Sequence, residues 1–155
     1  MKKDICLGAA VLLASGLLAA SAAVAQPLGL WATEDNQGQV EISQCADKLC
    51  GDLVWLADAA DEQGSPKLDA RNPDESLRSR PLKGLRILWD MQPSGDGKTW
   101  TDGRVYDPES GKTYQGRITL EQEDTLKLRG FVGAPVFGRT STWTRVEQTA
   151  EQDRP

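Results

Sequence analysis

Three carboxylates are the residues of this chain whose type and placement fit a hydrolytic reaction. Asp69, Asp102 and Asp107 would have to face one another across a scissile bond, as the carboxyl groups of a glycoside hydrolase do. The chain has no histidine, which excludes Ser-His-Asp and Cys-His mechanisms. Asp107 also begins a proline-containing turn, where an aspartate commonly caps backbone amides. We therefore expect a non-catalytic protein and keep a carboxylate-based hydrolase as an alternative.

Basic and aromatic side chains form a second group, which suits ligand binding. Arginine presents a bidentate fork to an anion, so two or three of Arg104, Arg129, Arg139 and Arg145 would form an anion or carboxylate site if they point into the barrel. The alternative is that Arg104 and Arg129 face solvent and pair with acids across the sheet, and that Arg145 only covers Trp31. Trp100 follows a polar glycine-rich loop, which predicts an exposed aromatic at a rim, and two tyrosines flank one hairpin. The candidate ligand-binding residues are Trp100, Arg104, Tyr106, Tyr114, Arg129 and Arg139.

Cys45 and Cys50 are separated by four residues, and we expect them to form a disulfide in an oxidising compartment. They flank a predicted four-residue hairpin loop, residues 46–49, where opposed positions bring Cβ atoms within disulfide reach. Closing so short a loop predicts a stabilisation of about 2 kcal/mol. The spacing does not fit a Cys-x-x-Cys redox motif, and the lack of histidine leaves no predicted zinc site. We expect no metal and no cofactor.

The first residues predict an export signal. Two lysines precede an apolar run over residues 5–20, and residues 23–25 form a small-x-small cleavage site. We expect cleavage after Ala25, which makes residues 1–25 a signal peptide and places the protein in the periplasm or outside the cell. The formal net charge of −5 disfavours nucleic acid and anionic lipid headgroups as partners. We expect a monomer that does not span the membrane.

Short strands are the elements that must position these side chains. Apolar and polar residues alternate, as they do in half-buried strands, and turn-forming residues separate the segments. We expect strands over residues 28–33, 39–45, 49–56, 85–90, 99–106, 114–120, 126–129 and 139–146. About eight strands with hairpin-length connections predict an all-β, antiparallel up-and-down barrel. This single domain would cover residues 26–146, and residues 147–155 would form a polar tail.

The longest irregular segment, residues 57–80, predicts a loop over one mouth of the barrel. It contains the one short helix that the sequence predicts, with Asn72 as the N-cap and Pro73 as the first helical residue. Pro81 limits this helix to a turn or two.

The two ends of the predicted barrel resemble those of lipocalins. Gly29-Leu30-Trp31 is similar to the first-strand signature of that family, in which the tryptophan plugs the closed end of the barrel. A late arginine in lipocalins lies across the indole, and Trp143-Thr144-Arg145 lies on the last predicted strand. The resemblance therefore implies a barrel-closing stack of Arg145 on Trp31, which combines a cation–π contact with burial of the guanidinium stem.

A second resemblance covers nearly all of the chain after residue 25. The segments that carry it include Val40-Glu41-Ile42, Leu49-Cys50-Gly51, Asn72-Pro73-Asp74, Gly103-Arg104-Val105-Tyr106-Asp107-Pro108, Gly111-Lys112-Thr113-Tyr114 and Leu128-Arg129-Gly130. Together they are similar to a family of exported bacterial proteins catalogued as domain of unknown function 2147 (DUF2147). This resemblance implies an exported protein and supplies no activity.

Noncovalent binding of a small apolar or amphipathic ligand is the function that we expect. The ligand would enter the open mouth of a lipocalin-like barrel, with the loop over residues 57–80 as a lid. The alternatives are an envelope protein-interaction or structural module, which would act through its outer surface, and the carboxylate-based hydrolase. A hollow barrel would favour binding, whereas a barrel packed solid would favour a surface role.

Overall fold

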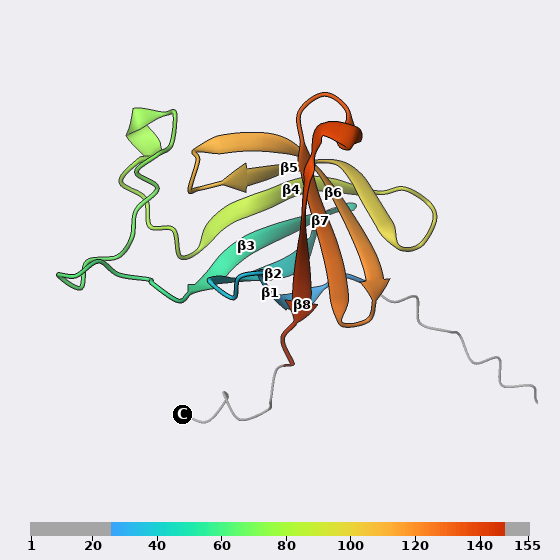
Figure 1. The fold of residues 1–155 in the computed structure, drawn as a ribbon, viewed down its shortest axis with the longest axis horizontal. Coiled ribbons are helices and arrows are strands. Elements are labelled where there is room, and N and C mark those ends of the chain that lie inside the picture. Colours follow the sequence, from blue (N-terminus) through green and yellow to red (C-terminus); the bar gives the residue numbers. More distant parts are fainter. Residues whose placement is uncertain (1–25, 148–155) are drawn as a thin grey trace, which may run out of the picture.

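The computed structural model describes residues 26–147, which form a closed antiparallel β-barrel (Figure 1). Each strand pairs with the next along the chain, and the last strand pairs with the first. The strands are β1 Gly29–Ala32, β2 Gly38–Cys45, β3 Lys48–Leu56, β4 Leu85–Pro93, β5 Thr99–Asp107, β6 Lys112–Gln122, β7 Thr125–Phe131 and β8 Arg139–Arg145. Two 3-10 turns, η1 (Glu75–Leu77) and η2 (Pro135–Phe137), lie in the loops. The predicted all-β up-and-down barrel is confirmed.

The first and last strands close the barrel at one end. Trp31 of β1 pairs with Arg145 of β8, and the Arg145 guanidinium carbon lies 4.3 Å from the centroid of the Trp31 ring. Trp31 is fully buried, and its indole nitrogen donates a hydrogen bond to the carbonyl of Pro27 at 2.8 Å. Arg145 donates to the carbonyls of Leu28 and Glu123, each at 2.6 Å. One side chain thus ties the first strand to the β6–β7 turn.

Large apolar side chains fill the barrel from its middle to this closed end. The fully buried ones are Trp31, Val40, Ile42, Leu88, Met91, Ile118 and Leu126. Glycines on the inner wall make room for them, because a Cβ on Gly51 would lie 2.9 Å from Leu88 Cδ1 and one on Gly116 would lie 2.5 Å from Met91 Cε. In the core, large apolar side chains therefore pack directly against the backbone at glycine positions.

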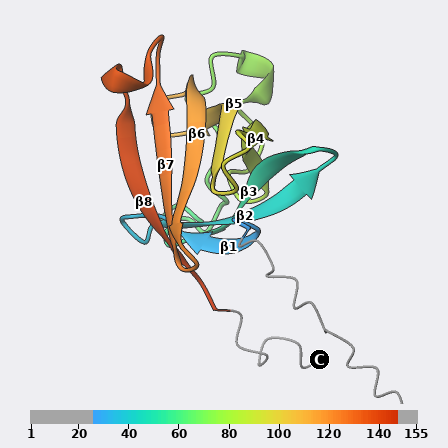
Figure 2. The same cartoon turned by 90° about the vertical axis from the view of Figure 1, so that its right-hand side faces the viewer.

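The other end of the barrel is open and carries the longer connections. Figure 2 shows η2 beyond the upper ends of β7 and β8, while the β6–β7 turn lies at the bottom beside β1. The β1–β2 turn, the segment over residues 57–84, the β5–β6 turn and the η2 loop all belong to the open end. No helix within residues 26–147 is long and apolar enough to cross a membrane.

Two local predictions were wrong. The β2–β3 hairpin loop consists of two residues, Ala46 and Asp47, and not of the predicted four, because Cys45 pairs with Lys48. Cys50 consequently lies opposite Ser43, so the cysteines are diagonal neighbours; they still form the expected disulfide, with a Cα–Cα distance of 5.9 Å. Ala46 has a φ of 57°, the left-handed conformation that a two-residue hairpin turn requires.

The N-cap of the short helix was also predicted at the wrong residue. Asp74 is the cap, because its carboxylate accepts from the amide of Ser76 at 2.9 Å. The side chain of Asn72 points instead into a buried polar cluster, described below. The predicted signal peptide, residues 1–25, and all but the first residue of the predicted tail, residues 147–155, lie outside the described residues.

Candidate ligand-binding site

The open half of the barrel contains a cavity of about 1120 Å³, which we call the mouth cavity. Three of the four open-end connections contribute to its walls, all but the η2 loop, together with the adjoining ends of β3, β4, β7 and β8. Its apolar lining comes from Leu53, Leu56, Leu82, Ile87, Leu128 and Trp143. Leu53, Ile87, Leu128 and Trp143 are nearly buried and belong to the core, so the floor of the cavity is the edge of the packed core.

The long loop forms one wall of the mouth cavity. Leu68, Ala70 and Leu82 line it, and the backbone of Leu68 bridges to Pro81 across the loop. Leu68 is 43% exposed, which makes it a partly exposed apolar side chain on this wall. The long loop therefore contributes apolar side chains to one wall of the cavity.

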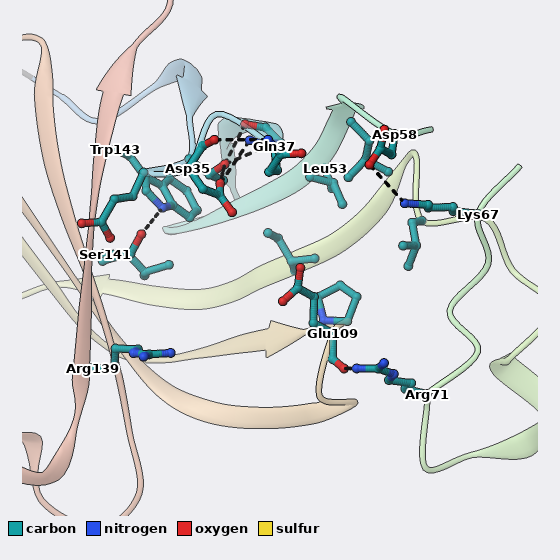
Figure 3. A pocket seen from close by; sticks show the side chains of 18 of the residues that line it. Asp35, Gln37, Leu53, Asp58, Lys67, Arg71, Glu109, Arg139, Ser141 and Trp143 are labelled. Atoms are coloured by element: carbon teal, nitrogen blue, oxygen red, sulfur yellow. Dashed lines mark hydrogen bonds and ion pairs between the residues drawn. The ribbon is translucent and has the colours of Figure 1, made fainter. Parts of the chain in front are cut away.

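Most charged groups at the rim are held by local contacts. The Asp35 carboxylate accepts from the Thr33 hydroxyl at 2.7 Å and the amide of Gln37 at 3.1 Å, and these hydrogen bonds, the former most, lower the pKa of Asp35. Lys67 lies 3.7 Å from Asp58 across an exposed ion pair. Figure 3 shows these side chains around the cavity. These charges shape the turns that bear them.

Arg139 is the basic residue that extends from β8 into the cavity (Figure 3). It lies on the same face of β8 as Ser141 and Trp143, both of which also line the cavity. Within residues 26–147, its guanidinium has no hydrogen bond or ion pair. A polar group on a ligand would find an unused fork of donors at this point.

A smaller side pocket of about 380 Å³ adjoins the mouth cavity beneath the η2 loop. Leu128, Arg139 and Ser141 line both spaces. Tyr114, Val132 and Phe137 are among the other side chains of the pocket. Arg139 therefore lies where the two spaces meet.

A buried polar cluster anchors the long loop to the outer wall of β5. Asp69 is fully buried; it accepts from Tyr106 Oη at 2.5 Å and Asn72 Nδ2 at 2.8 Å, and Arg80 lies 2.9 Å from its carboxylate. Burial, followed by the hydrogen bond to Asp69 and the charge of that residue, raises the pKa of Tyr106 to about 12. The cluster satisfies groups that would be costly to bury unpaired, so it has a structural role.

The structure separates the six predicted ligand-binding residues. Arg139 lines both spaces, and Tyr114 lines the side pocket. Tyr106 points outward into the polar cluster, and Arg104, also on the outer face of β5, is exposed. Arg129 is likewise outside, where it donates to the Thr140 hydroxyl at 2.6 Å.

The predicted exposure of Trp100 at a rim was wrong. Trp100 is 7% exposed and belongs to the core. The pairing register shifts between Trp100 and Gly103, where Asp102 adopts a φ of 59°. This bulge turns Trp100 toward the interior although a polar loop precedes it.

The three carboxylates considered for hydrolysis have separate structural roles. Asp69 is fully buried in the polar cluster and cannot reach a substrate. Asp107 accepts from the amide of Glu109 at 3.0 Å and the hydroxyl of Ser110 at 2.6 Å, as its turn-capping position predicts. Asp102 is exposed at the bulge in β5 and accepts from the Thr101 hydroxyl. None of the three is among the described residues that line the mouth cavity, although Asp107 lines the side pocket together with Arg139.

Sequence reasoning missed Ser141, Trp143 and the leucines of the cavity wall as site residues. The signal was present, because Arg139, Ser141 and Trp143 alternate along one strand and so must share one face. Which stretch of that face stays open depends on where the packed core ends. Within the described part of the chain, no three His, Cys, Asp or Glu residues are grouped as a metal ion would require.

Comparison with known proteins agrees with the barrel. No curated protein matches the chain. A solved structure from Helicobacter pylori, titled as protein HP1028 that belongs to the lipocalin family, superposes with a TM-score of 0.70 at 24% identity, covering 79% of this chain and 84% of that one. At this identity the likeness concerns the fold alone. Residues 29–145 match the family described as "Uncharacterized protein conserved in bacteria (DUF2147)", and the chain therefore belongs to the DUF2147 family.

Proposed function

We propose that this protein binds a small apolar or amphipathic ligand noncovalently in the mouth cavity. The observation that carries the proposal is the hollow of about 1120 Å³ above a solidly packed core. Small-molecule sites typically occupy roughly 300 to 1,000 Å³ and are lined by apolar side chains with a few placed polar groups. The mouth cavity is of about that size, and it combines apolar side chains of the strands with polar and charged side chains, most of them from the loops at its rim.

Arg139 and Ser141 are the polar groups that would orient the ligand. Their position between the mouth cavity and the side pocket lets an apolar part lie against Leu128 and Trp143 while a polar end contacts the guanidinium. Tyr114 would contact whatever part enters the side pocket. Trp100, Arg104, Tyr106 and Arg129 are not part of this proposed site.

The site of action that we propose is the periplasm or the cell exterior. The Cys45–Cys50 disulfide supports an oxidising compartment. The predicted cleavage after Ala25 would leave the barrel intact, because β1 begins at Gly29. Mass analysis of the exported protein tests this directly, since the N-terminus would then be Gln26.

Native mass spectrometry is the first test of ligand binding. Protein would be purified from the exported fraction without detergent and measured before and after denaturation. A reproducible extra mass, lost on denaturation, is the expected result, and its identification in an organic extract would give the ligand class. A second test is needed because a weakly held ligand would be lost during purification.

The second test fills the cavity with a side chain. Ala70 is an exposed residue of the loop whose side chain lines the mouth cavity, and Ala59 is an exposed residue of the same loop that is not among the lining residues. The probe is 1-anilinonaphthalene-8-sulfonate, an apolar anion. We expect Ala70→Trp to weaken its binding at least about tenfold and Ala59→Trp to leave it unchanged. Equal binding by both variants would contradict a ligand site in this cavity.

A further inference from the structure

The loop between β7 and β8 bears the most exposed large apolar side chains of the described chain. Val132 is 70% exposed, Val136 is 75% exposed and Phe137 is 82% exposed. We call these three residues the apolar tip. We infer that the apolar tip docks the barrel onto the surface of an anionic lipid bilayer, a role that does not depend on ligand binding.

The charge of this hairpin is opposite to that of the whole protein. The chain has 18 basic and 23 acidic residues, yet residues 125–146 contain no acidic residue and four basic ones. The four are Lys127, Arg129, Arg139 and Arg145. Arg129 and Arg139 lie beside the apolar tip, whereas Arg145 closes the opposite end of the barrel and Lys127 is paired with Glu121. The attraction to an anionic surface therefore rests on the two arginines next to the tip, because each basic residue near such a surface contributes to binding.

The tip is held in shape rather than loose. Arg129 donates to the carbonyl of Pro135 at 2.6 Å, to that of Val136 at 3.4 Å and to the hydroxyl of Thr140 at 2.6 Å. The amide of Phe137 donates to the carbonyl of Ala134 at 3.1 Å, which closes η2. The exposed side chains thus project from a backbone that is already ordered, so docking costs little conformational entropy.

A bilayer suits this surface better than a protein partner does. Three side chains on one turn offer much less area than the roughly 1,200 to 2,000 Å² that stable protein interfaces bury. Shallow insertion of a few apolar side chains, assisted by nearby basic residues, is how peripheral proteins bind membranes. Glu34 and Asp35 on the β1–β2 turn and Glu109 on the β5–β6 turn are acidic rim residues, so the contact would be limited to the β7–β8 loop itself.

Docking in this way would place the mouth of the barrel next to the membrane. Val132 and Phe137 also line the side pocket, which adjoins the mouth cavity through Leu128 and Arg139. A lipid surface that covers the tip would therefore lie at the entrance of the hollow.

Vesicle flotation tests the inference. Protein that begins at Gln26 would be mixed with vesicles of phosphatidylcholine alone or of phosphatidylcholine with phosphatidylglycerol. We expect flotation with the anionic vesicles, weaker flotation with the neutral ones, and release by high salt. The double variant V136S/F137S should bind at least about tenfold more weakly, because it removes most of the inserting apolar surface.

The matched control is Leu77→Ser on η1, where the leucine is 37% exposed and belongs to a different loop. This variant should float like the unaltered protein. Failure to float with either kind of vesicle, or equal flotation by V136S/F137S, would overturn the inference. So would a dimer that sediments as one species and that V136S/F137S dissociates, because the tip would then be an interface between two copies.

Discussion

The phenol of Tyr106 on β5 donates a hydrogen bond of 2.5 Å to the carboxylate of Asp69 in the long loop. The two residues are 37 positions apart in the sequence. Both are buried, because Asp69 is 0% exposed and Tyr106 is 5% exposed. Their contact fixes a segment with little regular structure of its own to the outer wall of the barrel. The same loop lines one wall of the mouth cavity, so this hydrogen bond helps to set the shape of the cavity.

Replacing Asp69 should loosen the loop. Asp69→Asn removes the charge that faces Arg80 and puts an amide where the carboxylate accepts hydrogen bonds. Because the Arg80 side chain is 39% exposed and keeps some water, we expect a loss of about 2 kcal/mol in the free energy of unfolding. Urea unfolding measures this loss, and limited proteolysis should cut the variant within residues 57–84.

Asp61→Asn is the control for that experiment. Asp61 lies in the same loop and is exposed, and its carboxylate accepts from the amides of Gln63 and Ser65. It should change the free energy of unfolding by less than about 1 kcal/mol and leave the protease pattern unchanged. A similar loss in both variants would mean that the cluster does not anchor the loop.

Ionisation of Tyr106 should make stability depend on alkaline pH. The folded-state pKa of Tyr106 is raised to about 12, above the ordinary value of 10.0, because burial and the Asp69 carboxylate disfavour the phenolate. The contribution of this group is therefore complete below about pH 10 and is lost as the pH rises toward about 12. The free energy of unfolding should fall over this range by up to about 1.4 kcal/mol per pH unit.

Tyr106→Phe isolates this effect from the other groups that titrate at alkaline pH. The variant should be less stable near pH 8, and its deficit relative to the unaltered protein should shrink as the pH rises above 10. Denaturant unfolding at a series of pH values gives the difference. Parallel curves for the two proteins would show that the phenol does not ionise differently in the folded state.

Met91 and Gly116 should be energetically coupled. A Cβ on Gly116 would lie 2.5 Å from Met91 Cε, whereas its next neighbours are 3.5 Å away. Gly116→Ala alone should therefore destabilise the barrel by about 1 to 3 kcal/mol. Met91→Val alone should also destabilise it, by leaving a cavity.

The double variant is predicted to be more stable than the sum of the two losses implies. A shorter side chain at position 91 makes room for the new methyl group, so the coupling free energy should exceed about 0.5 kcal/mol. Urea unfolding of all four proteins in the cycle gives that value. Strict additivity would show that the two residues do not compete for the same space.

Arg145 should stabilise the closure of the barrel through its fork of donors more than through its charge. Arg145→Ala removes the contact with the Trp31 ring and the hydrogen bonds to the carbonyls of Leu28, Gln26 and Glu123. We expect a loss of about 3 kcal/mol, and about 2 kcal/mol for Arg145→Lys, which keeps the charge but not the fork. Thermal and urea unfolding would measure both, and a full rescue by lysine would contradict this account.

The sequence by itself determined the barrel. Apolar and polar residues alternate in segments such as residues 114–120 and 126–129, and this alternation predicts which side chains face the interior. The connections between strands are short, so consecutive strands are expected to pair in an antiparallel way. The Cys45–Cys50 disulfide was also predicted from the sequence, because these two cysteines lie close together in the chain and few other cysteines could pair with them. These are local properties, which is why they can be read without coordinates.

The tertiary structure decided what the sequence left open. The bulge at Asp102 turns Trp100 into the core, and the outward face of β5 places Tyr106 against Asp69. The residue types alone predict neither the bulge nor this contact. The extent of the mouth cavity depends on where Met91 and its neighbours stop filling the barrel. Such features arise from contacts between strands distant in the chain, and the balance of space among those contacts is not a property of any single segment.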